Sequence, residues 1–353
     1  MSKTRLAFVA AACIAACPTV RAQDAPADAG MPNPRHEQHD ALRQLAGNWQ
    51  LAIHCEPMPG VPGMEEATDS TGTERAELIC DGLWVKSTMR GTQAGEPFEG
   101  LWLVGYDPNA KRYTGVWASS HEEDGGFFKM DGHYDPATRT WTWTGDTPQG
   151  PMRSEVAFDG EDRMVETVYT IGEDGEATQC MEIARQRVKS LAVDARAERP
   201  AELAAEYSVL HDDVGTWDAV VTTTMPGQPA AESNATERVA AVCDGHWVWS
   251  DFRGNFQGMP FEGHALVGYD PNAEQYVSLW IDSMSPTPTI TTGDYDEATR
   301  TYRLTGSAAG PGGVPMEVTE VLTWKDDDTR VLEMAFDMGG DKSTMRIDYA
   351  RRK

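Results

Sequence analysis

The stretch PFEG at residues 97–100, followed by GYDPNA at 105–110, recurs as PFEG at 260–263 and GYDPNA at 268–273. The spacing between the two blocks is the same in both places. A long block that recurs once in a chain predicts two copies of one structural unit. A chain of 353 residues accommodates two units of roughly 150 residues each, which is a common size for a domain with its own core.

The repeat extends outward in both directions from this stretch. The block CDG-x-WV at 80–85 recurs at 243–248, and YD-x-ATRT at 134–140 recurs at 295–301. Each half also begins with Leu-x4-Gly-x-Trp, and each has a later tryptophan, Trp117 or Trp280. Because the blocks keep their order with only small changes of spacing, the insertions between them are expected to be loops.

Each copy is predicted to be rich in β-strands. Short alternating runs recur about every 8–12 residues, separated by Gly, Pro, Asn and Asp, a pattern typical of consecutive antiparallel strands. In copy one, about ten strands are expected near 47–56, 71–80, 83–91, 98–106, 111–119, 125–134, 139–146, 152–159, 163–171 and 177–186. A short helical stretch precedes each set, at 36–45 and at 201–213. One helix followed by about ten sequential strands favours an all-β fold of two tandem up-and-down barrels, because closure leaves no exposed edge strand.

The combination of Gly-x-Trp, Pro-Phe-x-Gly, Gly-Tyr-Asp and the later tryptophan resembles a bacterial family known only as a domain of unknown function. That family is grouped with the calycins, which are lipocalin-like barrels. The resemblance covers both copies, roughly 36–187 and 203–353. It implies a barrel and, as a habit of the superfamily, small-ligand binding. It implies no reaction and no catalytic residues, since fold alone does not define function.

The N-terminus has the pattern of a secretory signal. Lys3 and Arg5 precede an apolar stretch at 6–16 that is too short to span a bilayer, and Val20-Arg21-Ala22 resembles a cleavage site. The alternative is a lipoprotein signal, because Ile14-Ala15-Ala16-Cys17 resembles a lipobox in which Cys17 would carry a lipid anchor. The expected location is therefore secreted and periplasmic, or anchored to a membrane by lipid. No later segment is apolar enough to cross a membrane.

These observations divide the chain into five parts. They are a signal peptide at 1–22, a disordered Pro/Ala/Asp-rich segment at 23–35, copy one at 36–187, a linker at 188–202 and copy two at 203–353.

Composition and spacing exclude several classes of function. The chain has 30 Lys and Arg against 56 Asp and Glu, a formal net charge of −26, which disfavours binding to nucleic acid and to anionic membranes. The histidines do not repeat between the copies, and neither they nor the cysteines have metal-ligand spacing. No metal and no cofactor are expected.

The two Asp-Gly dipeptides, in the CDG blocks, predict type I′ hairpin turns. Such a turn places Ile79 opposite Trp84, and Val242 opposite Trp247. The face of the hairpin that carries these tryptophans is expected to point outward. The other face then carries Glu74 and Glu237, which we expect to point into the barrels near one end. A buried carboxylate needs a partner, and perturbed carboxylates cluster at functional sites, so both are candidate site residues.

Aromatic residues that recur in both copies are candidates for the wall of a ligand cavity. We expect Trp117 and Trp280 to point inward, together with Ser119 and Asp282, which share their faces two residues later. The recurring phenylalanines, Phe98 and Phe261, are further candidates. The alternative interpretation of these aromatic residues is a core with no ligand.

A disulfide is expected between Cys55 and Cys180. Copy two has neither cysteine at the matching positions, and the first and last strands of an up-and-down barrel are neighbours. The alternative is that all the thiols are free. Cys80 and Cys243 occupy matching positions and are expected to be buried and unpaired.

The function favoured by these patterns is an exported protein that binds a small, apolar or amphipathic molecule in one or both barrels. One rival is an enzyme, such as an isomerase or hydrolase, that uses Glu74, Glu237 or Asp282 as an acid or base in the same cavity. The other rival is a structural or interaction module whose barrels are filled by side chains.

Overall fold

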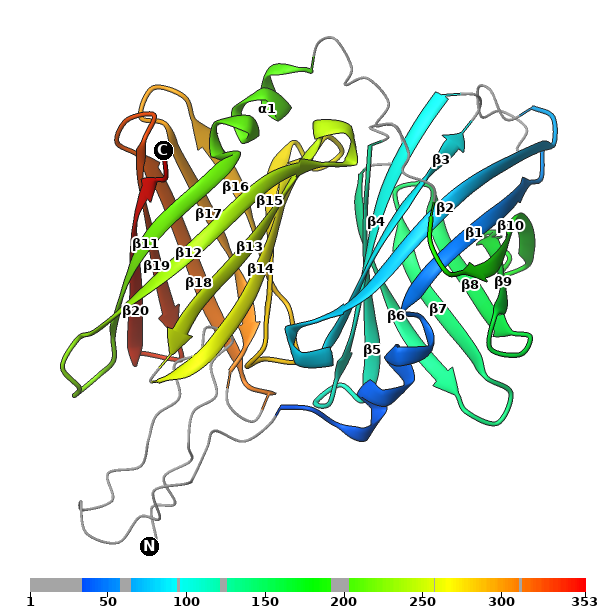
Figure 1. Ribbon diagram of the computed structural model, residues 1–353, viewed down its shortest axis with the longest axis horizontal. Coiled ribbons are helices and arrows are strands. Elements are labelled where there is room, and N and C mark those ends of the chain that lie inside the picture. Colours follow the sequence, from blue (N-terminus) through cyan, green and yellow to red (C-terminus); the bar gives the residue numbers. More distant parts are fainter. Residues whose placement is uncertain are drawn as a thin grey trace, which may run out of the picture.

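In the residues that the computed structural model describes, the strands form two closed antiparallel barrels that lie side by side (Figure 1). The described residues are 34–57, 65–93, 96–120, 126–191, 203–256, 258–310 and 313–353. The predicted signal peptide, including Cys17, lies outside them, as do most of the predicted disordered segment and most of the predicted linker. No helix among the described residues has the length and apolarity that spanning a membrane requires.

The first barrel has ten strands that agree closely with the predicted ranges. They are β1 (Gly47–Cys55), β2 (Thr68–Ile79), β3 (Trp84–Gln93), β4 (Glu96–Asp107), β5 (Arg112–Ser119), β6 (Phe127–Asp135), β7 (Thr140–Thr147), β8 (Gly150–Phe158), β9 (Arg163–Ile171) and β10 (Ala177–Val188). Each strand pairs with the next, and β1 pairs with both β2 and β10. The barrel is therefore closed, because the first strand has no free edge.

The second barrel repeats this order and also closes, through pairing of β11 with β20. Its strands are β11 (Gly215–Thr224), β12 (Ala231–Val242), β13 (Trp247–Phe256), β14 (Met259–Asp270), β15 (Gln275–Asp282), β16 (Thr289–Asp296), β17 (Thr301–Ala309), β18 (Pro315–Trp324), β19 (Thr329–Asp337) and β20 (Lys342–Arg351). The predicted fold of two tandem ten-stranded barrels is confirmed.

The two Cys-Asp-Gly turns have the predicted register. Ile79 lies opposite Trp84, and Val242 lies opposite Trp247. Both aspartates have left-handed backbone conformations, with φ of 54° at Asp81 and 52° at Asp244, as a type I′ turn requires. The cysteines that precede them are also left-handed. These short turns are labelled η2 (Cys80–Gly82) and η4 (Cys243–Gly245).

A short helical segment covers the corresponding end of each barrel. It is η1 (Glu37–Gln44) in the first barrel, and α1 (Ala205–Ser208) with η3 (Val209–Asp213) in the second. The Gly-x-Trp motif joins this segment to the first strand. In the first barrel, the Trp49 indole donates to the carbonyl oxygen of Leu45 at 3.0 Å. Gly47 has a φ of 149°, and a Cβ atom on it would stand 2.1 Å from Nη1 of Arg187. The glycine is thus required both by its backbone conformation and by the arginine that packs over Trp49 at 4.0 Å.

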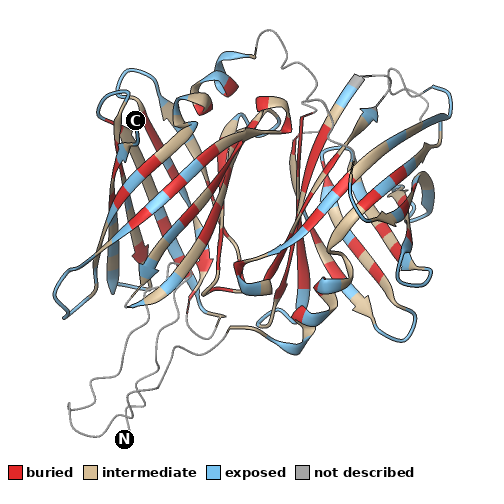
Figure 2. Ribbon diagram, in the orientation of Figure 1, coloured by how far each residue is buried: buried red, intermediate tan, exposed pale blue. Residues whose placement is uncertain are grey.

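The outward faces of β3–β5 and β13–β15 pack against each other and form a core between the barrels (Figure 2). Trp84 and Trp247, on the predicted outward face, do point away from their barrels, but both are fully buried at this contact. Lys86 lies over the Trp249 ring at 4.0 Å, and the Trp247 indole donates to the Ser119 carbonyl oxygen at 3.1 Å. The face is therefore outward, as expected, and the second copy covers it.

The expected disulfide between Cys55 and Cys180 is not formed in the structure, where both thiols are free. The two cysteines do lie on neighbouring strands, since Cys55 pairs with Met181. However, the pairing of β9 with β10 shifts by one residue at Cys180, and the Cys180 thiol donates to the Val168 carbonyl oxygen on β9 at 3.4 Å. The bulge therefore turns this thiol toward β9. Cys80 and Cys243 are buried and unpaired, as predicted.

Candidate functional site

Each barrel encloses a buried arginine that is held by two carboxylates. In the first barrel, Arg185 Nε donates to Glu74 at 2.6 Å, and Arg185 Nη2 lies 2.8 Å from Glu166. The hydroxyl groups of Ser87 and Ser154 each donate to one of these carboxylates at 2.5 Å. Burial alone would lower the pKa of Arg185, but the two carboxylates raise it more, so the guanidinium stays charged.

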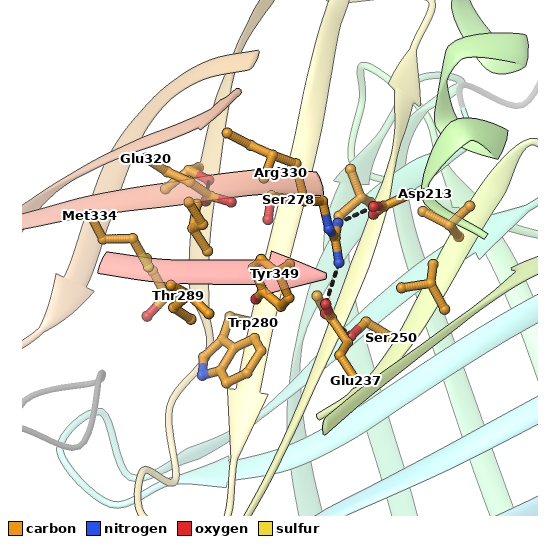
Figure 3. Close-up of a pocket in the computed structure, with 18 of the residues that line it drawn as sticks. Asp213, Glu237, Ser250, Ser278, Trp280, Thr289, Glu320, Arg330, Met334 and Tyr349 are labelled. Atoms are coloured by element: carbon orange, nitrogen blue, oxygen red, sulfur yellow. Dashed lines mark hydrogen bonds and ion pairs between the residues drawn. The ribbon is translucent and has the colours of Figure 1, made fainter. Parts of the chain in front are cut away.

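The second barrel builds a related cluster from different positions. Arg330 donates to both Asp213 and Glu237, and the Ser250 hydroxyl donates to Glu237 (Figure 3). The guanidinium also lies over the Trp217 ring at 4.5 Å and the Tyr349 ring at 4.3 Å.

The arginine is supplied by a different strand in each barrel. On the paired strands β9 and β10, Met164 stands opposite Arg185; on β19 and β20, Arg330 stands opposite Tyr349. Arg330 of the second barrel therefore corresponds to Met164 of the first, and Tyr349 corresponds to Arg185. In both barrels the arginine still reaches the glutamate on the second strand, Glu74 or Glu237, so that both predicted inward glutamates are buried in ion pairs.

The second barrel contains a cavity of about 90 Å³ beside its ion-pair cluster (Figure 3). The polar residues that line it are Asp213, Glu237, Ser250, Ser278, Thr289, Thr291, Glu320, Arg330 and Tyr349. Its apolar lining includes Val239, Val248, Ala265, Val267, Trp280, Leu322, Leu332, Met334, Phe336 and Ile347. The site is therefore an amphipathic chamber, with an ion-pair cluster at one end, Glu320 apart from that cluster, and hydrocarbon around them.

The strand registers explain how the second barrel gains this space. Ser278 pairs with Thr291 and Trp280 pairs with Thr289 in the second barrel. At the corresponding pairs, the first barrel has Gly115 with Met130 and Trp117 with Phe128. On the next strand, Ala265 replaces Trp102, since each lies opposite the equivalent tryptophan, Trp280 or Trp117.

The large side chains of the first barrel pack tightly against one another. Trp102 contacts Trp143 edge-to-face, with ring centroids 5.3 Å apart, and Met130 belongs to the same core cluster. A Cβ atom on Gly115 would stand 2.2 Å from the Trp102 ring, so the glycine makes room for that indole. Alanine and threonine at the matching positions of the second barrel leave volume that these aromatic rings would occupy.

Glu320, on β18, faces the cavity and differs from the other lining carboxylates in its surroundings. Thr291 Oγ1 donates to Glu320 at 2.9 Å, and the Ser278 hydroxyl also donates to it. Burial raises the pKa of Glu320, and these two hydrogen bonds offset only part of that rise. In the first barrel Ser154 occupies this position, because Ser154 pairs with Trp143 as Glu320 pairs with Leu304.

The predicted aromatic residues lie inside their barrels. Phe98 stacks on Trp117 with ring centroids 6.0 Å apart, and Phe261 stacks on Trp280 at 6.3 Å. Each tryptophan ring covers a glycine of the neighbouring strand: a Cβ atom on Gly263 would stand 2.3 Å from the Trp280 ring. Trp280 lines the cavity of the second barrel, whereas Trp117 packs within the core of the first.

Ser119 and Asp282 are both buried, but neither lines the cavity. Asp282 accepts from the Trp280 indole at 2.9 Å and from the backbone N–H groups of Met284 and Ser285 at 2.7 and 2.8 Å. It therefore orients Trp280 and fixes the turn after β15. The carbonyl oxygen of Ser119 accepts from Trp247 of the other barrel.

Sequence reasoning missed Arg330, Glu320 and the small polar residues of β15 and β16. One signal was available: a comparison of the copies shows that Trp102, Phe128 and Met130 of the first are replaced by Ala265, Thr289 and Thr291 in the second. The pairing of Arg330 with Glu237 joins residues 93 positions apart, and no local pattern indicates it. Among the described residues, no group of three or more His, Cys, Asp and Glu is placed to hold a metal ion.

The sequence matches the model of a protein family described as "Protein of unknown function (DUF1579)" at residues 34–187 and again at 202–351. The chain belongs to this family. Each match coincides with one barrel, so this chain consists of two DUF1579 domains in tandem. No curated protein matches the chain in sequence.

Several solved structures are similar to this DUF1579 protein at low sequence identity. An S-type phycobiliprotein lyase from Guillardia theta is 12% identical, with 41% of this chain and 92% of that chain covered and a TM-score of 0.32. A DUF3598 protein of unknown function from Nostoc punctiforme is 12% identical, with 90% and 100% covered and a TM-score of 0.25. A double mutant of transferrin-binding protein B from Haemophilus parasuis is 7% identical, with 86% and 75% covered and a TM-score of 0.20.

Proposed function

We propose that this protein is an exported small-molecule-binding protein whose ligand site is the cavity of the second barrel. The observation that carries the proposal is the difference between the copies. Small residues on β14 to β16 open a chamber where the first barrel has Trp102, Phe128 and Met130. The first barrel packs larger side chains at these positions and covers one outer face of the second.

The dimensions of the cavity indicate a compact ligand. A cavity of about 90 Å³ is smaller than the roughly 150 Å³ engineered cavity that admits benzene, and larger than one water molecule needs. Its lining combines hydrocarbon with hydroxyl and carboxylate groups. A molecule of a few non-hydrogen atoms, with an apolar body and one polar group, is therefore the kind of ligand that fits.

The three carboxylates considered above as acid or base catalysts are engaged in contacts within the protein, which favours a binding function over catalysis. Glu74 and Glu237 are each engaged by an arginine and a serine hydroxyl. Asp282 accepts three hydrogen bonds and does not line the cavity. A general base must be within reach of its substrate, and these three side chains are committed to holding the structure.

Export is part of the proposal and rests on the N-terminal sequence. Lys3 and Arg5 before the apolar stretch at 6–16 favour a periplasmic protein, released after residue 22 or anchored by lipid at Cys17. Fractionation of the native host, with mass analysis of the mature N-terminus, distinguishes the two routes. An unprocessed protein that begins at Met1 in the cytoplasm would contradict export.

The binding proposal is tested by filling the cavity with the residues that the first barrel uses. The variant Thr289→Phe/Thr291→Met should lose the ligand that the wild-type protein retains in native mass spectrometry after purification from its own periplasm. Thr319→Met is the matched control, because Thr319 is exposed on β18 beside Glu320; it should retain the ligand.

Thermal unfolding with a panel of compact neutral, anionic and cationic molecules gives a second readout. The wild-type protein should be stabilised by at least one class, and the filled variant by none. If no compact molecule co-purifies or stabilises the wild-type protein, or if the filled variant binds equally well, the cavity is not a ligand site and a structural or interaction module replaces this proposal.

A further inference from the structure

Glu320 is the one charged side chain of the cavity lining that has no oppositely charged partner within the described parts of the chain. The other charged lining residues, Asp213, Glu237 and Arg330, neutralise one another in the ion-pair cluster. In Figure 3, the Arg330 guanidinium is directed at Asp213 and Glu237, and Glu320 stands apart from this cluster. Its contacts are instead the hydroxyl groups of Thr291 and Ser278.

The charge balance of the two barrel interiors differs by this one residue. In the first barrel, Arg185 faces Glu74 and Glu166, and Ser154 donates a hydrogen bond to that cluster. In the second barrel, Arg330 likewise faces two carboxylates, but Glu320 replaces Ser154 and adds a third. An ionised carboxylate in a low-dielectric interior is costly unless a cation or hydrogen-bond donors compensate it.

Two features indicate that a ligand would bind beside Glu320 in its ionised form. First, Thr291 and Ser278 approach from β16 and β15 as donors, which is the arrangement that supports a carboxylate. Second, Trp280 follows Ser278 by two residues on the same face of β15, about 6.6 Å further along the strand. A carboxylate from β18 and an aromatic ring from β15 therefore both line the chamber.

We propose that the ligand of this cavity is a compact organic cation, with its ammonium group beside Glu320 and against the Trp280 ring; the proposal rests on the binding function proposed above. The carboxylate supplies the counter-charge, and the indole face adds a cation–π attraction. The apolar side chains around them, such as Leu332 and Met334, favour alkyl groups on the cation. Among the described residues, no group of three or more His, Cys, Asp and Glu is placed to hold a metal ion in its stead.

This assignment predicts how binding depends on pH. The charged and titratable groups that face the chamber with Glu320 are Asp213, Glu237, Arg330 and Tyr349. Arg330 remains charged, because the carboxylates offset the effect of burial on its pKa, and burial keeps the Tyr349 phenol neutral by raising its pKa well above its usual range. Because burial raises the pKa of Glu320, a cation and a proton compete for it, and affinity for the cation increases as the pH rises through that pKa.

The experiment compares tetramethylammonium chloride with its uncharged isostere tert-butanol, by calorimetric titration and thermal unfolding of the full protein. Sodium chloride at equal ionic strength and sodium acetate are the ionic controls. The proteins are the wild type, Glu320→Gln and the matched control Glu317→Gln, since Glu317 is exposed on the same strand. We expect tetramethylammonium to bind the wild type and Glu317→Gln, and to bind Glu320→Gln at least about tenfold more weakly, because that variant lacks the counter-charge.

Three outcomes overturn the inference. Tetramethylammonium that binds no better than tert-butanol, equal affinity for Glu320→Gln, or equal stabilisation by sodium chloride would each exclude Glu320 as the site of an organic cation. If tert-butanol binds the wild type and Thr289→Phe/Thr291→Met abolishes this, the binding function stands while the cation assignment fails. If neither probe binds and nothing is retained from the native host, both proposals fail together.

Discussion

At the scale of single residues, the two barrel interiors contain buried ion pairs that local sequence does not explain. Arg185 is nearly inaccessible, and the carboxylates around it are largely buried. A buried ion pair contributes little net stability compared with a well-packed apolar pair, but removal of one partner leaves an uncompensated charge. The stability of each barrel therefore depends on keeping its cluster complete.

We expect Arg185→Leu to destabilise the protein by about 3–5 kcal/mol, because Glu74 and Glu166 would remain buried without their cation. Denaturant unfolding measures the loss. Arg346→Leu is the control, because Arg346 pairs with Glu333 and Asp348 at the exposed surface; it should cost less than about 1 kcal/mol. Equal losses in the two variants would show that the buried cluster has no special role.

Substitution of Glu320, unlike that of Arg185, should raise the stability of the protein at neutral pH. The pKa of Glu320 in the folded protein is raised above the ordinary value of 4.5, mainly by burial. The folded state therefore holds a proton that the unfolded state releases, and stability falls as the pH rises from 4.5 through the raised pKa. Glu320→Gln removes this effect, so we expect the variant to melt above the ligand-free wild type at about pH 7.5, and by a smaller margin at about pH 4.

Calorimetry at the two pH values tests this expectation, with a change of about 2–4 °C for each kcal/mol in a domain of this size. Glu317→Gln should show no comparable difference between the two pH values. A lower melting temperature for Glu320→Gln than for the wild type at the higher pH would contradict a buried carboxylate without a cation.

At the scale of elements, the seam between β1 and β10 closes the first barrel and brings Cys55 next to Cys180 in the ladder. The backbone N–H of Glu56 donates to the Cys180 carbonyl oxygen at 2.9 Å, so the two strands remain paired at the cysteines. The thiols are free in the structure, and the bulge at Cys180 directs its sulfur to Val168. A disulfide would need this side chain to turn toward β1.

As part of the export proposal, we expect oxidation in the periplasm to form this bond in the mature protein. Thiol titration under denaturing, non-reducing conditions should then find two free thiols, Cys80 and Cys243, and peptide mapping should place the bond at Cys55–Cys180. Reduction should lower the melting temperature, because a cross-link over so long a loop stabilises by up to about 4–5 kcal/mol. Four free thiols in protein taken directly from the periplasm would refute the bond.

At the scale of the whole molecule, the two barrels meet through matching faces. Leu103 and Leu266 occupy corresponding positions in the copies and are both fully buried in the shared core. Lys86 and Trp249 also correspond to each other, and they are in contact across the junction. When equivalent positions face each other, the interface has the geometry of a twofold dimer, here formed within one chain.

We expect the barrels to remain associated when the chain between them is cut. A protease site introduced between residues 192 and 202 allows this test by size-exclusion chromatography after cleavage. The cut wild type should elute as one species, and Leu103→Asp/Leu266→Asp should separate into two. Leu78→Asp, at a partly exposed position of β2, is the control and should stay associated. Immediate separation of the cut wild type would show that the interface depends on the covalent link.

Local sequence pattern was enough to predict the duplication, the strands, the hairpin register at Trp84 and Trp247, and the closure of each barrel. These features depend on alternation with a period of two and on turn residues, which are local properties of a chain. The same alternation placed Glu74 and Glu237 inside, because side chains on one strand face must share the barrel interior.

The residues that complete the site, in contrast, are selected by packing in three dimensions. Arg185 reaches Glu74 across 111 residues of sequence, and the corresponding arginine of the second barrel comes from another strand. The burial of Trp84 required a second barrel to dock on an outward face. The cavity exists because several strands of the second copy have small residues at the same level along the barrel axis. Glu320 can be recognised as a cavity residue only once that space is known. Such properties depend on packing between distant segments, and local pattern carries no information about it.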